Sequence, residues 1–386
     1  MEPQPYFAVS APGLETLTAG ELRRLGITPK VAVQAGQAAS LSDEDGGGGV
    51  SFAGGQVALY RANLHLRTAS RVLVRLGAFP ATLFSELRKR AAQLPWRLYL
   101  RPGQPVNLRV TCHKSRLYHS GAVAERVLAA IGDQLGKPSV QVKGEESGQL
   151  IVVRLLHDQC TISVDSSGEL LHRRGYRLET AKAPLRETLA AGLLLASGWD
   201  GSAPLLDPFC GSGTIAIEGA LLAAGLPPGR AREFAFMHWP GFNRAEWDAV
   251  QASAGPAAPS AVCPPILASD RDAGAVRIAQ SNAARAGVEG CISFAQQAVS
   301  AIQPPPGPGW VVTNPPYGLR VSANKDLRNL YAQLGNVLRA HCPGWNVAIL
   351  CSDRVLLGQT GLSLDTSLSL VNGGLRVLVG RGQVPG

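Results

Sequence analysis

Two short stretches about a hundred residues apart constrain the fold of this 386-residue chain more than any other feature. The first, residues 205–214, is an apolar run that ends in Asp207 and a glycine-rich turn, and a helical pattern follows directly. This order predicts a strand, a loop and a helix. Gly211 and Gly213 lack Cβ atoms, so a ligand can approach the backbone, and the first N–H groups of the helix can bind an anion. A turn that only packs a strand against a helix would look similar, and this alternative stays open.

The second stretch, residues 310–318, is an apolar strand that ends in Asn314, two prolines and Tyr317. Residues before proline are held extended and each proline fixes its own φ. Asn314 and the carbonyl of Pro315 should therefore be rigid at the C-terminal edge of the strand, where open α/β sheets bind ligands. Both oxygens can accept hydrogen bonds from an amine on an aromatic ring, and Tyr317 can stack on that ring. The structural alternative is a proline-rich turn after a buried strand.

Together these residues resemble the class I S-adenosylmethionine-dependent methyltransferases that modify exocyclic amines of nucleobases. Two flanking segments, 171–177 (LHRRGYR) and 183–190 (APLRETLA), narrow the resemblance. With them the chain resembles the bacterial THUMP-domain RNA methyltransferases that make N2-methylguanosine, typified by the 23S rRNA guanine-N2 enzymes and their tRNA relatives. The resemblance covers nearly the whole chain. It implies an α/β class, with a Rossmann-like methyltransferase sheet that finishes in an antiparallel hairpin and is preceded by α+β ferredoxin-like and THUMP domains.

The length suggests two or three domains. Guided by the resemblance, we expect a ferredoxin-like element at 1–60, a THUMP RNA-binding domain at 61–165, a basic linker at 166–182 and the methyltransferase domain at 183–386.

The resemblance also assigns roles to single residues. Gly211 and Gly213 would approach the methionyl end of S-adenosylmethionine, Asp207 would meet its ammonium, and Asp270 would accept hydrogen bonds from the ribose. Gln297 stands where most relatives place an Asp for the adenine amine. Thr214 is the expected N-cap of the helix. The residues expected to bind the cofactor are Pro184, Leu185, Asp207, Pro208, Gly211, Ser212, Gly213, Thr214, Asp270, Arg271, Gln297 and Asn314. Those expected to act on the acceptor amine are Asn314, Pro315, Pro316 and Tyr317.

The formal charge of +9 is unevenly distributed. Residues 1–180 hold 22 Lys and Arg against 15 Asp and Glu, a net +7, whereas residues 181–386 hold 15 against 13, a net +2. Structured RNA as a partner would explain the imbalance, although many basic proteins bind no polyanion. The residues expected to contact RNA are Lys114, Arg116, Arg173, Arg174 and Arg177. For Lys114 and Arg116, surface solubility is an equal explanation.

The cysteines, the histidines and the distribution of apolar residues argue against disulfide-rich, metal-binding and membrane proteins. The seven cysteines include no C-x-x-C pair, which favours reduced thiols, and the seven histidines show no ligand spacing, so we expect no metal site. No signal peptide opens the chain and no apolar run approaches the length of a membrane span. We therefore expect a cytoplasmic protein with no membrane contact.

Along the chain, alternating patterns predict helices and strands in turn. Strands are expected at 6–10, 50–53, 105–111, 149–156, 160–165, 266–270, 291–295, 310–313, 346–352, 363–370 and 375–380, and helices at 13–26, 83–94, 119–135, 184–197, 272–286 and 326–340. Residues 57–76 carry Arg61, Arg67, Arg71 and Arg75 at near-helical spacing, which predicts either a solvated helix face or RNA contacts. Residues 225–262 are interpreted as an insertion with short helices in the methyltransferase domain.

Three rival functions stay open. A DNA adenine-N6 methyltransferase would share the Asn-Pro-Pro-Tyr stretch, but we would not expect it to carry the first 165 residues and the basic linker. A tRNA guanine-N2 methyltransferase would share the same chemistry, but the N-terminal half and the linker resemble the bacterial ribosomal group more closely. A non-catalytic RNA-binding ribosome assembly factor would share the basic half, and the glutamine at position 297 mildly favours it.

Overall fold

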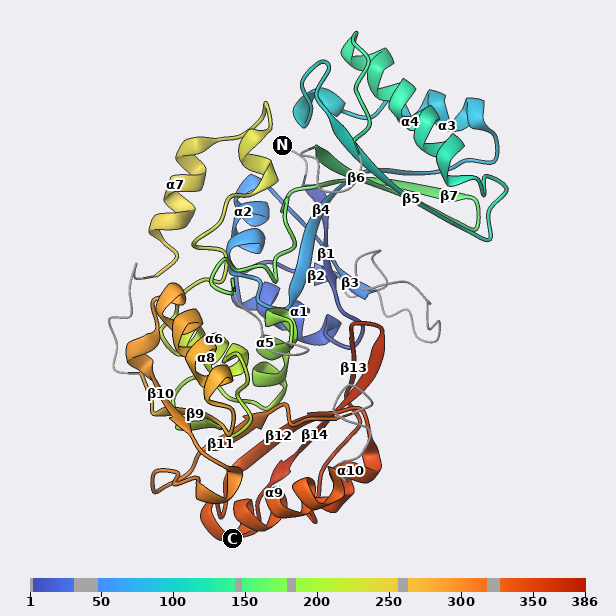
Figure 1. Cartoon of the computed structure of the whole chain (residues 1–386). Coiled ribbons are helices and arrows are strands. Elements are labelled where there is room, and N and C mark those ends of the chain that lie inside the picture. Colours follow the sequence, from blue (N-terminus) through green and yellow to red (C-terminus); the bar gives the residue numbers. More distant parts are fainter. Residues whose placement is uncertain (1–2, 31–47, 143–147, 179–184, 256–262, 318–326) are drawn as a thin grey trace.

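The computed structural model describes residues 3–30, 48–142, 148–178, 185–255, 263–317 and 327–386. Its described residues form two seven-stranded sheets, one built from the N-terminal half and one from the C-terminal half (Figure 1). The expected order of an α+β half followed by a Rossmann-like sheet is confirmed.

The first sheet has the strand order β2-β3-β1-β4-β7-β6-β5. Its strands are β1 (Gln4–Ser10), β2 (Pro29–Lys30), β3 (Gly48–Gly54), β4 (Ala69–Pro80), β5 (Val106–His113), β6 (Gln149–Leu156) and β7 (Gln159–Asp165). The accompanying helices are α1 (Glu15–Arg24), α2 (Gln56–His65), α3 (Phe84–Ala91), η2 (Trp96–Leu98) and α4 (Ser120–Leu135). The expected boundary between residues 60 and 61 falls inside α2, and strand β4 joins the two parts into one sheet.

The near-helical spacing of the arginines over 57–76 corresponds to a helix only in the first part of this segment. Helix α2 ends at His65, and the following residues form β4, in which Val72 and Val74 are buried on one face. A strand places alternate side chains on opposite faces, so Arg71 and Arg75 lie on the other face of the sheet. Arginines four residues apart lie on one face in a helix and also on one face in a strand, so their spacing does not distinguish the two. The β-branched valines between Arg71 and Arg75 favour the strand.

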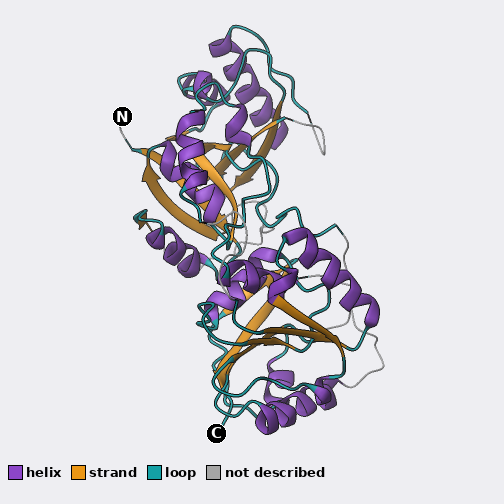
Figure 2. Ribbon diagram, turned by 90° about the vertical axis from the view of Figure 1, so that its left-hand side faces the viewer, coloured by secondary structure: helices purple, strands orange, loops and turns teal. Residues whose placement is uncertain are grey.

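The second sheet has the order β10-β9-β8-β11-β12-β14-β13. Its strands are β8 (Leu205–Asp207), β9 (Ile266–Asp270), β10 (Ile292–Gln296), β11 (Trp310–Thr313), β12 (Asn346–Cys351), β13 (Ser369–Asn372) and β14 (Leu375–Gln383). Its helices are α5 (Glu187–Ala196), α6 (Thr214–Ala223), α8 (Ala273–Ala286), η4 (Glu289–Cys291), η5 (Val299–Ala301), α9 (Leu327–His341) and α10 (Arg354–Gln359). Strands β8 to β12 pair in parallel, and the predicted antiparallel C-terminal hairpin is confirmed as β13–β14. Helices cover both faces of this sheet (Figure 2).

The helical elements of the insertion pack on the N-terminal half, although the second sheet precedes and follows them in sequence. These two elements, η3 (Ala235–His238) and α7 (Arg244–Ala252), lie beside α2 in Figure 1. The ring of Phe236 lies 4.7 Å from that of Tyr60, and the ring of Trp239 lies 4.9 Å from that of Tyr99. These aromatic contacts make the insertion part of the N-terminal core.

The two halves also meet through a buried arginine and a tight glycine. The guanidinium of Arg67 donates to the carbonyls of Leu221 and Leu226, at the C-terminal end of α6. A cation at that end of a helix is favoured by the helix dipole. Gly13 has a φ of +95°, and a Cβ there would lie 2.1 Å from the carbonyl oxygen of Ser369 on β13. The N-terminal half is therefore docked closely on the C-terminal hairpin.

The expectation that all cysteines are reduced is wrong for one pair. Cys263 and Cys291 are joined by a disulfide, with Cα atoms 5.5 Å apart at the N-terminal ends of β9 and β10. Their sequence spacing gave no sign of this, because neighbouring strands bring together residues that are far apart in the chain. In the described part of the chain, no helix has the length and apolarity to cross a membrane, and no group of His, Cys, Asp and Glu could hold a metal ion.

Candidate cofactor and acceptor site

The two sequence stretches meet at one edge of the second sheet. Strands β8 and β11 are parallel neighbours, so Asp207 and Thr313, the last residues of each, lie at the same C-terminal edge. The hydroxyl of Thr313 donates to Oδ1 of Asp207 over 2.7 Å. A single hydrogen bond thus joins the glycine-rich stretch to the Asn-Pro-Pro-Tyr stretch, at the place where open α/β sheets bind ligands.

The glycine-rich loop leaves room for a ligand on one side and packs tightly on the other. Gly211 has a φ of +51°, and a Cβ at this position would meet nothing within 4 Å. A Cβ on Gly213, by contrast, would lie 2.9 Å from the Cβ of Ala279 on α8. Gly213, with φ +83°, occupies the N-cap position of α6, so the expectation that Thr214 is the N-cap is wrong.

The next strand brings a second carboxylate to this loop. Asp270 ends β9, and its carboxylate accepts hydrogen bonds from the backbone N–H of Gly211 and of Asp272. The N–H of Gln297 donates to the backbone carbonyl of Asp270 over 3.0 Å, so the backbones of these two residues are adjacent. Arg271 is exposed, and Leu185 is buried just before α5 begins. Pro184 lies outside the described residues.

The carboxyl of Asp207 is buried, and burial raises its pKa to about 7. The hydrogen bonds from Thr313 and from the N–H of Phe209 act in the opposite direction, and the nearby Asp270 adds a further upward effect. A buried carboxyl without a cationic partner favours its neutral form, whereas a bound ammonium would favour the carboxylate. The site is thus suited to a ligand that brings a positive charge.

The acceptor side of the site holds an unsatisfied oxygen. Oδ1 of Asn314 is buried and has no hydrogen-bond partner among the described residues. Buried acceptors are normally paired, and an exception indicates a function. Two further residues support the following turn: the hydroxyl of Tyr331 on α9 donates to the carbonyl of Pro316, and Nδ2 of Asn372 on β13 donates to the hydroxyl of Tyr317.

Sequence reasoning did not find Tyr331 or Asn372. Tyr331 is fully buried on the apolar face of α9, and in the sequence it reads as an ordinary core residue. Asn372 precedes two glycines and reads as a turn residue of the hairpin. Only the fold brings either of them to the Asn-Pro-Pro-Tyr turn.

Two of the expected RNA contacts in the linker are contradicted. Arg174 is 4% exposed, and its guanidinium donates to the carbonyls of Leu171 and Arg67 and lies 3.6 Å from Glu218. Arg177 is held by the carbonyl of Leu185 and the carboxylate of Glu187. Both cations therefore hold the linker to neighbouring elements of the protein and are not available to RNA phosphates.

The other three expected RNA contacts stay predictions. Lys114 and Arg116 are exposed in the loop after β5, and Arg173 is exposed beside Glu169.

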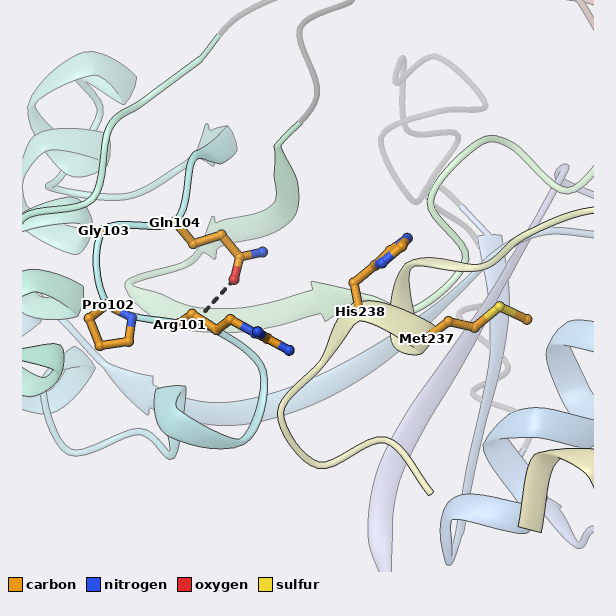
Figure 3. Close-up of a pocket in the computed structure, with 6 residues that line it drawn as sticks. All are labelled: Arg101, Pro102, Gly103, Gln104, Met237 and His238. Atoms are coloured by element: carbon orange, nitrogen blue, oxygen red, sulfur yellow. Dashed lines mark hydrogen bonds between the residues drawn. The ribbon is translucent and has the colours of Figure 1, made fainter. Parts of the chain in front are cut away.

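A separate pocket lies in the N-terminal half. It is lined by loop residues 101–104 together with Met237 and His238 of the insertion (Figure 3). None of these residues belongs to the two stretches described above, so this pocket is not part of the candidate site.

Comparison with known proteins agrees with this arrangement. The family model described as RMKL-like, methyltransferase domain, matches residues 174–377, and models of the RlmL ferredoxin-like domain and of the THUMP domain match residues 5–73 and 81–165. The chain belongs to the RMKL-like methyltransferase family. Ribosomal RNA large subunit methyltransferase K/L of Methylococcus capsulatus is 36% identical over 96% of this chain, and the match covers 50% of that protein.

Two solved structures are similar over nearly their whole length. The crystal structure of SMU.472 complexed with SAH is 30% identical, with a TM-score of 0.86, and the match covers 99% of this chain and 98% of that one. A structure from Listeria monocytogenes, described as a predicted N6-adenine-specific DNA methylase, is 33% identical, with a TM-score of 0.85 over 98% of this chain and 96% of that one. This chain therefore spans about half the length of the K/L relatives but nearly all of these two.

Proposed function

We propose that this protein transfers a methyl group from S-adenosylmethionine to the exocyclic N2 of a guanine in structured RNA, with 23S rRNA as the substrate. The observation that carries the proposal is the buried Oδ1 of Asn314, at the edge of the sheet beside the glycine-rich loop, which has no hydrogen-bond partner in the described part of the chain. An amine with two N–H groups is the ligand that such an oxygen and the neighbouring Pro315 carbonyl would satisfy.

The residues present fit the cofactor. S-adenosylmethionine, when bound, supplies an electrophilic methyl group. Asp207 would pair with its ammonium, the open side of Gly211 would admit its methionyl part, and Asp270 would accept from its ribose hydroxyls. Gln297, which lies beside Asp270, would accept from the adenine amine. Leu185, Pro208, Ser212, Gly213, Thr214 and Arg271 complete the proposed cofactor set with Asn314, and Pro184 lies outside the described residues.

The residues on the acceptor side would act by holding the target base and its amine in place. Asn314 and Pro315 would hold the two amine hydrogens and so orient the nitrogen lone pair, and Tyr317 would stack on the base, with Pro316 fixing the turn between them. No strong base is needed, because proximity and alignment supply most of the rate in a direct displacement. The target guanine must leave its stack, at a cost of a few kcal/mol that contacts to the RNA backbone would offset.

We choose rRNA as the substrate because of the domains that the chain contains and the names of its relatives. The THUMP match and the relatives named ribosomal RNA large subunit methyltransferase favour rRNA, and tRNA is the second candidate. The Listeria structure's name keeps the DNA adenine-N6 alternative in view, since Asn314 to Tyr317 would accept any conjugated amine. The proposed domain limits are 1–60, 61–165, 166–182 and 183–386, with the first limit moved out of α2, in which residues 60 and 61 both lie. The aromatic residues of the insertion pack in the N-terminal core, although the insertion lies within 183–386 in sequence.

The proposal is tested in a strain that lacks the protein. Nucleosides from separated rRNA and tRNA are compared with those of the parent strain by mass spectrometry. We expect a loss of N2-methylguanosine at one site in 23S rRNA, restored by the wild-type chain and not by Asn314→Ala. An unchanged N2-methylguanosine content in both RNA classes would contradict the proposal. Loss from tRNA alone would keep the chemistry and correct the substrate.

A further inference from the structure

The glycine-rich loop between β8 and α6 is open on one side and supported by helix α8 on another. A Cβ on Gly211 would meet no described atom within 4 Å, whereas one on Gly213 would lie 2.9 Å from the Cβ of Ala279. Asn282, three residues further along α8, donates from Nδ2 to the carbonyl of Ser212 over 3.1 Å. Residues three apart share one face of a helix, so a single face of α8, which lies beside α6 in Figure 1, makes both contacts to the loop.

The carbonyl of Ser212 needs such a donor. Ser212 and Asn282 are both buried, and a backbone carbonyl in the interior is destabilising unless it is paired. The next residue, Gly213, has a φ of +83°, a backbone conformation that other residues rarely adopt. The amide of Asn282 therefore stabilises, from outside the loop, a conformation that is unusual for a chain.

The side chain of Arg285 holds the Asn282 amide in the orientation that serves the loop. Its Nη2 donates to Oδ1 of Asn282 over 2.6 Å. A guanidinium only donates and a carbonyl only accepts, so the amide must present its oxygen to Arg285 and its nitrogen to Ser212. Nε of the same guanidinium donates to the backbone carbonyl of Tyr176 over 2.9 Å. A continuous path of hydrogen bonds thus runs from the linker to the glycine-rich loop.

Tyr176 also contacts the helix that follows the loop. This residue is buried, and its hydroxyl donates to Oε1 of Glu218 on α6 over 3.1 Å. In the same linker, Nε of Arg174 lies 3.6 Å from that oxygen, and the Arg174 guanidinium also donates to the carbonyl of Arg67 in the N-terminal half. The linker therefore contacts both helices beside the loop, α6 through Glu218 and α8 through Arg285.

We propose that Asn282 and Arg285 are positioning residues for the cofactor. Asn282 keeps the glycine-rich loop in the form that admits S-adenosylmethionine, and Arg285 makes this support depend on the position of the linker. The inference rests on the part of the proposed function that places the cofactor at this loop. A site that is in its binding form for only a fraction of the time loses affinity by that fraction, so removal of the support should weaken cofactor binding.

The test measures the affinity of the full chain for S-adenosylhomocysteine by calorimetry, with thermal unfolding as a separate readout. Asn282→Leu keeps the shape of the side chain and removes the hydrogen bonds of its amide. Its control is Val288→Ala, which opens a cavity in the same core just beyond the end of α8. Arg285 lies at the surface, so Arg285→Ala is a second variant should Asn282→Leu fail to fold, and its control is the exposed Arg277→Ala on the same helix.

We expect Asn282→Leu to weaken S-adenosylhomocysteine binding roughly tenfold and Arg285→Ala to weaken it about threefold to fivefold, since Arg285 acts only through the Asn282 amide. Val288→Ala should unfold at a lower temperature, yet both controls should bind within about twofold of wild type. The double variant of Asn282→Leu and Arg285→Ala should bind no more weakly than Asn282→Leu alone, because the two residues serve one path.

Three results would contradict this inference or its basis. Wild-type binding by both Asn282→Leu and Arg285→Ala, or equal weakening by Val288→Ala, would overturn the positioning role and leave the proposed function intact. Additive losses in the double variant would overturn the path from the linker through Arg285. A wild-type chain that does not bind S-adenosylhomocysteine would overturn the cofactor placement in the proposed function, and this inference with it.

Discussion

The hydroxyl of Thr313 donates to the buried carboxyl of Asp207 over 2.7 Å, and this bond joins the ends of two neighbouring strands. The cofactor loop follows one of these strands and the acceptor turn follows the other. A displacement of either strand would therefore separate the two halves of the candidate site. The bond also lowers the pKa of Asp207, although burial outweighs it and raises that pKa to about 7.

Cofactor binding should depend on pH through Asp207. The ordinary pKa of an aspartic acid is about 3.9, so burial keeps the Asp207 carboxyl protonated up to about pH 7. The ammonium of the cofactor pairs only with the ionised carboxylate of Asp207. Below about pH 7, cofactor affinity should therefore fall, approaching tenfold for each pH unit. By the same linkage, the contribution of Asp207 to stability is greatest below pH 4 and is lost as the pH rises towards 7.

Calorimetry of S-adenosylhomocysteine binding between about pH 5 and pH 8 measures this effect. Asp207→Asn should remove the pH dependence and Thr313→Val should move its midpoint upward. Burial raises the pKa of Glu187 to about 7 as well, so Glu187→Gln is the control and should keep the slope. If the pH dependence of binding disappeared in Glu187→Gln and persisted in Asp207→Asn, the titrating group would be Glu187, and this prediction would be contradicted.

Asn314→Ala should leave cofactor affinity unchanged and lower turnover by at least roughly a hundredfold. The lost oxygen would act mainly on the amine in the transition state, and such interactions change turnover more than ground-state binding. Asn314→Asp, which keeps an acceptor at the same distance, should retain more activity than the alanine variant. An equal loss of cofactor affinity and turnover in Asn314→Ala would show that the residue serves the cofactor alone.

Arg174 and Arg173 are adjacent but should respond differently to substitution. Arg174→Ala leaves Glu218 buried without its cation and should lower the free energy of unfolding by about 3 kcal/mol. Arg173→Ala removes an exposed cation and should leave the unfolding free energy within experimental error. Urea denaturation of the two variants is the measurement, and equal stability would contradict a buried structural role for Arg174.

Gly13 should tolerate a side chain less well than Gly26. Both have a positive φ, +95° and +73°, but only at Gly13 would a Cβ collide with a backbone atom, the carbonyl oxygen of Ser369. Gly26→Ala should cost about 1 kcal/mol from the backbone conformation alone. Gly13→Ala should cost more and should loosen the N-terminal half from the hairpin, which limited proteolysis would detect. Similar costs for both variants would mean that the two halves are not tightly docked here.

The sequence was sufficient where the determining interactions are local. The strand, glycine turn and helix at Asp207, and the rigid turn at Asn314, follow from residues adjacent in the chain. Arg174 and Arg177 in the linker were misassigned, because composition does not distinguish a cation that binds RNA from one that holds a carboxylate distant in sequence, as Arg174 does with Glu218. The insertion was placed in the wrong core for the same reason, since Trp239 finds its partner, Tyr99, 140 residues away.

Identification of the methylated base tests the central proposal most directly. The full chain is incubated with S-adenosylmethionine carrying a labelled methyl group and with unmodified rRNA, tRNA or DNA, and the products are digested to nucleosides. We predict label in N2-methylguanosine from large-subunit rRNA, and no label with Asn314→Ala. Label in N6-methyladenosine, or in DNA but not in RNA, would contradict the account.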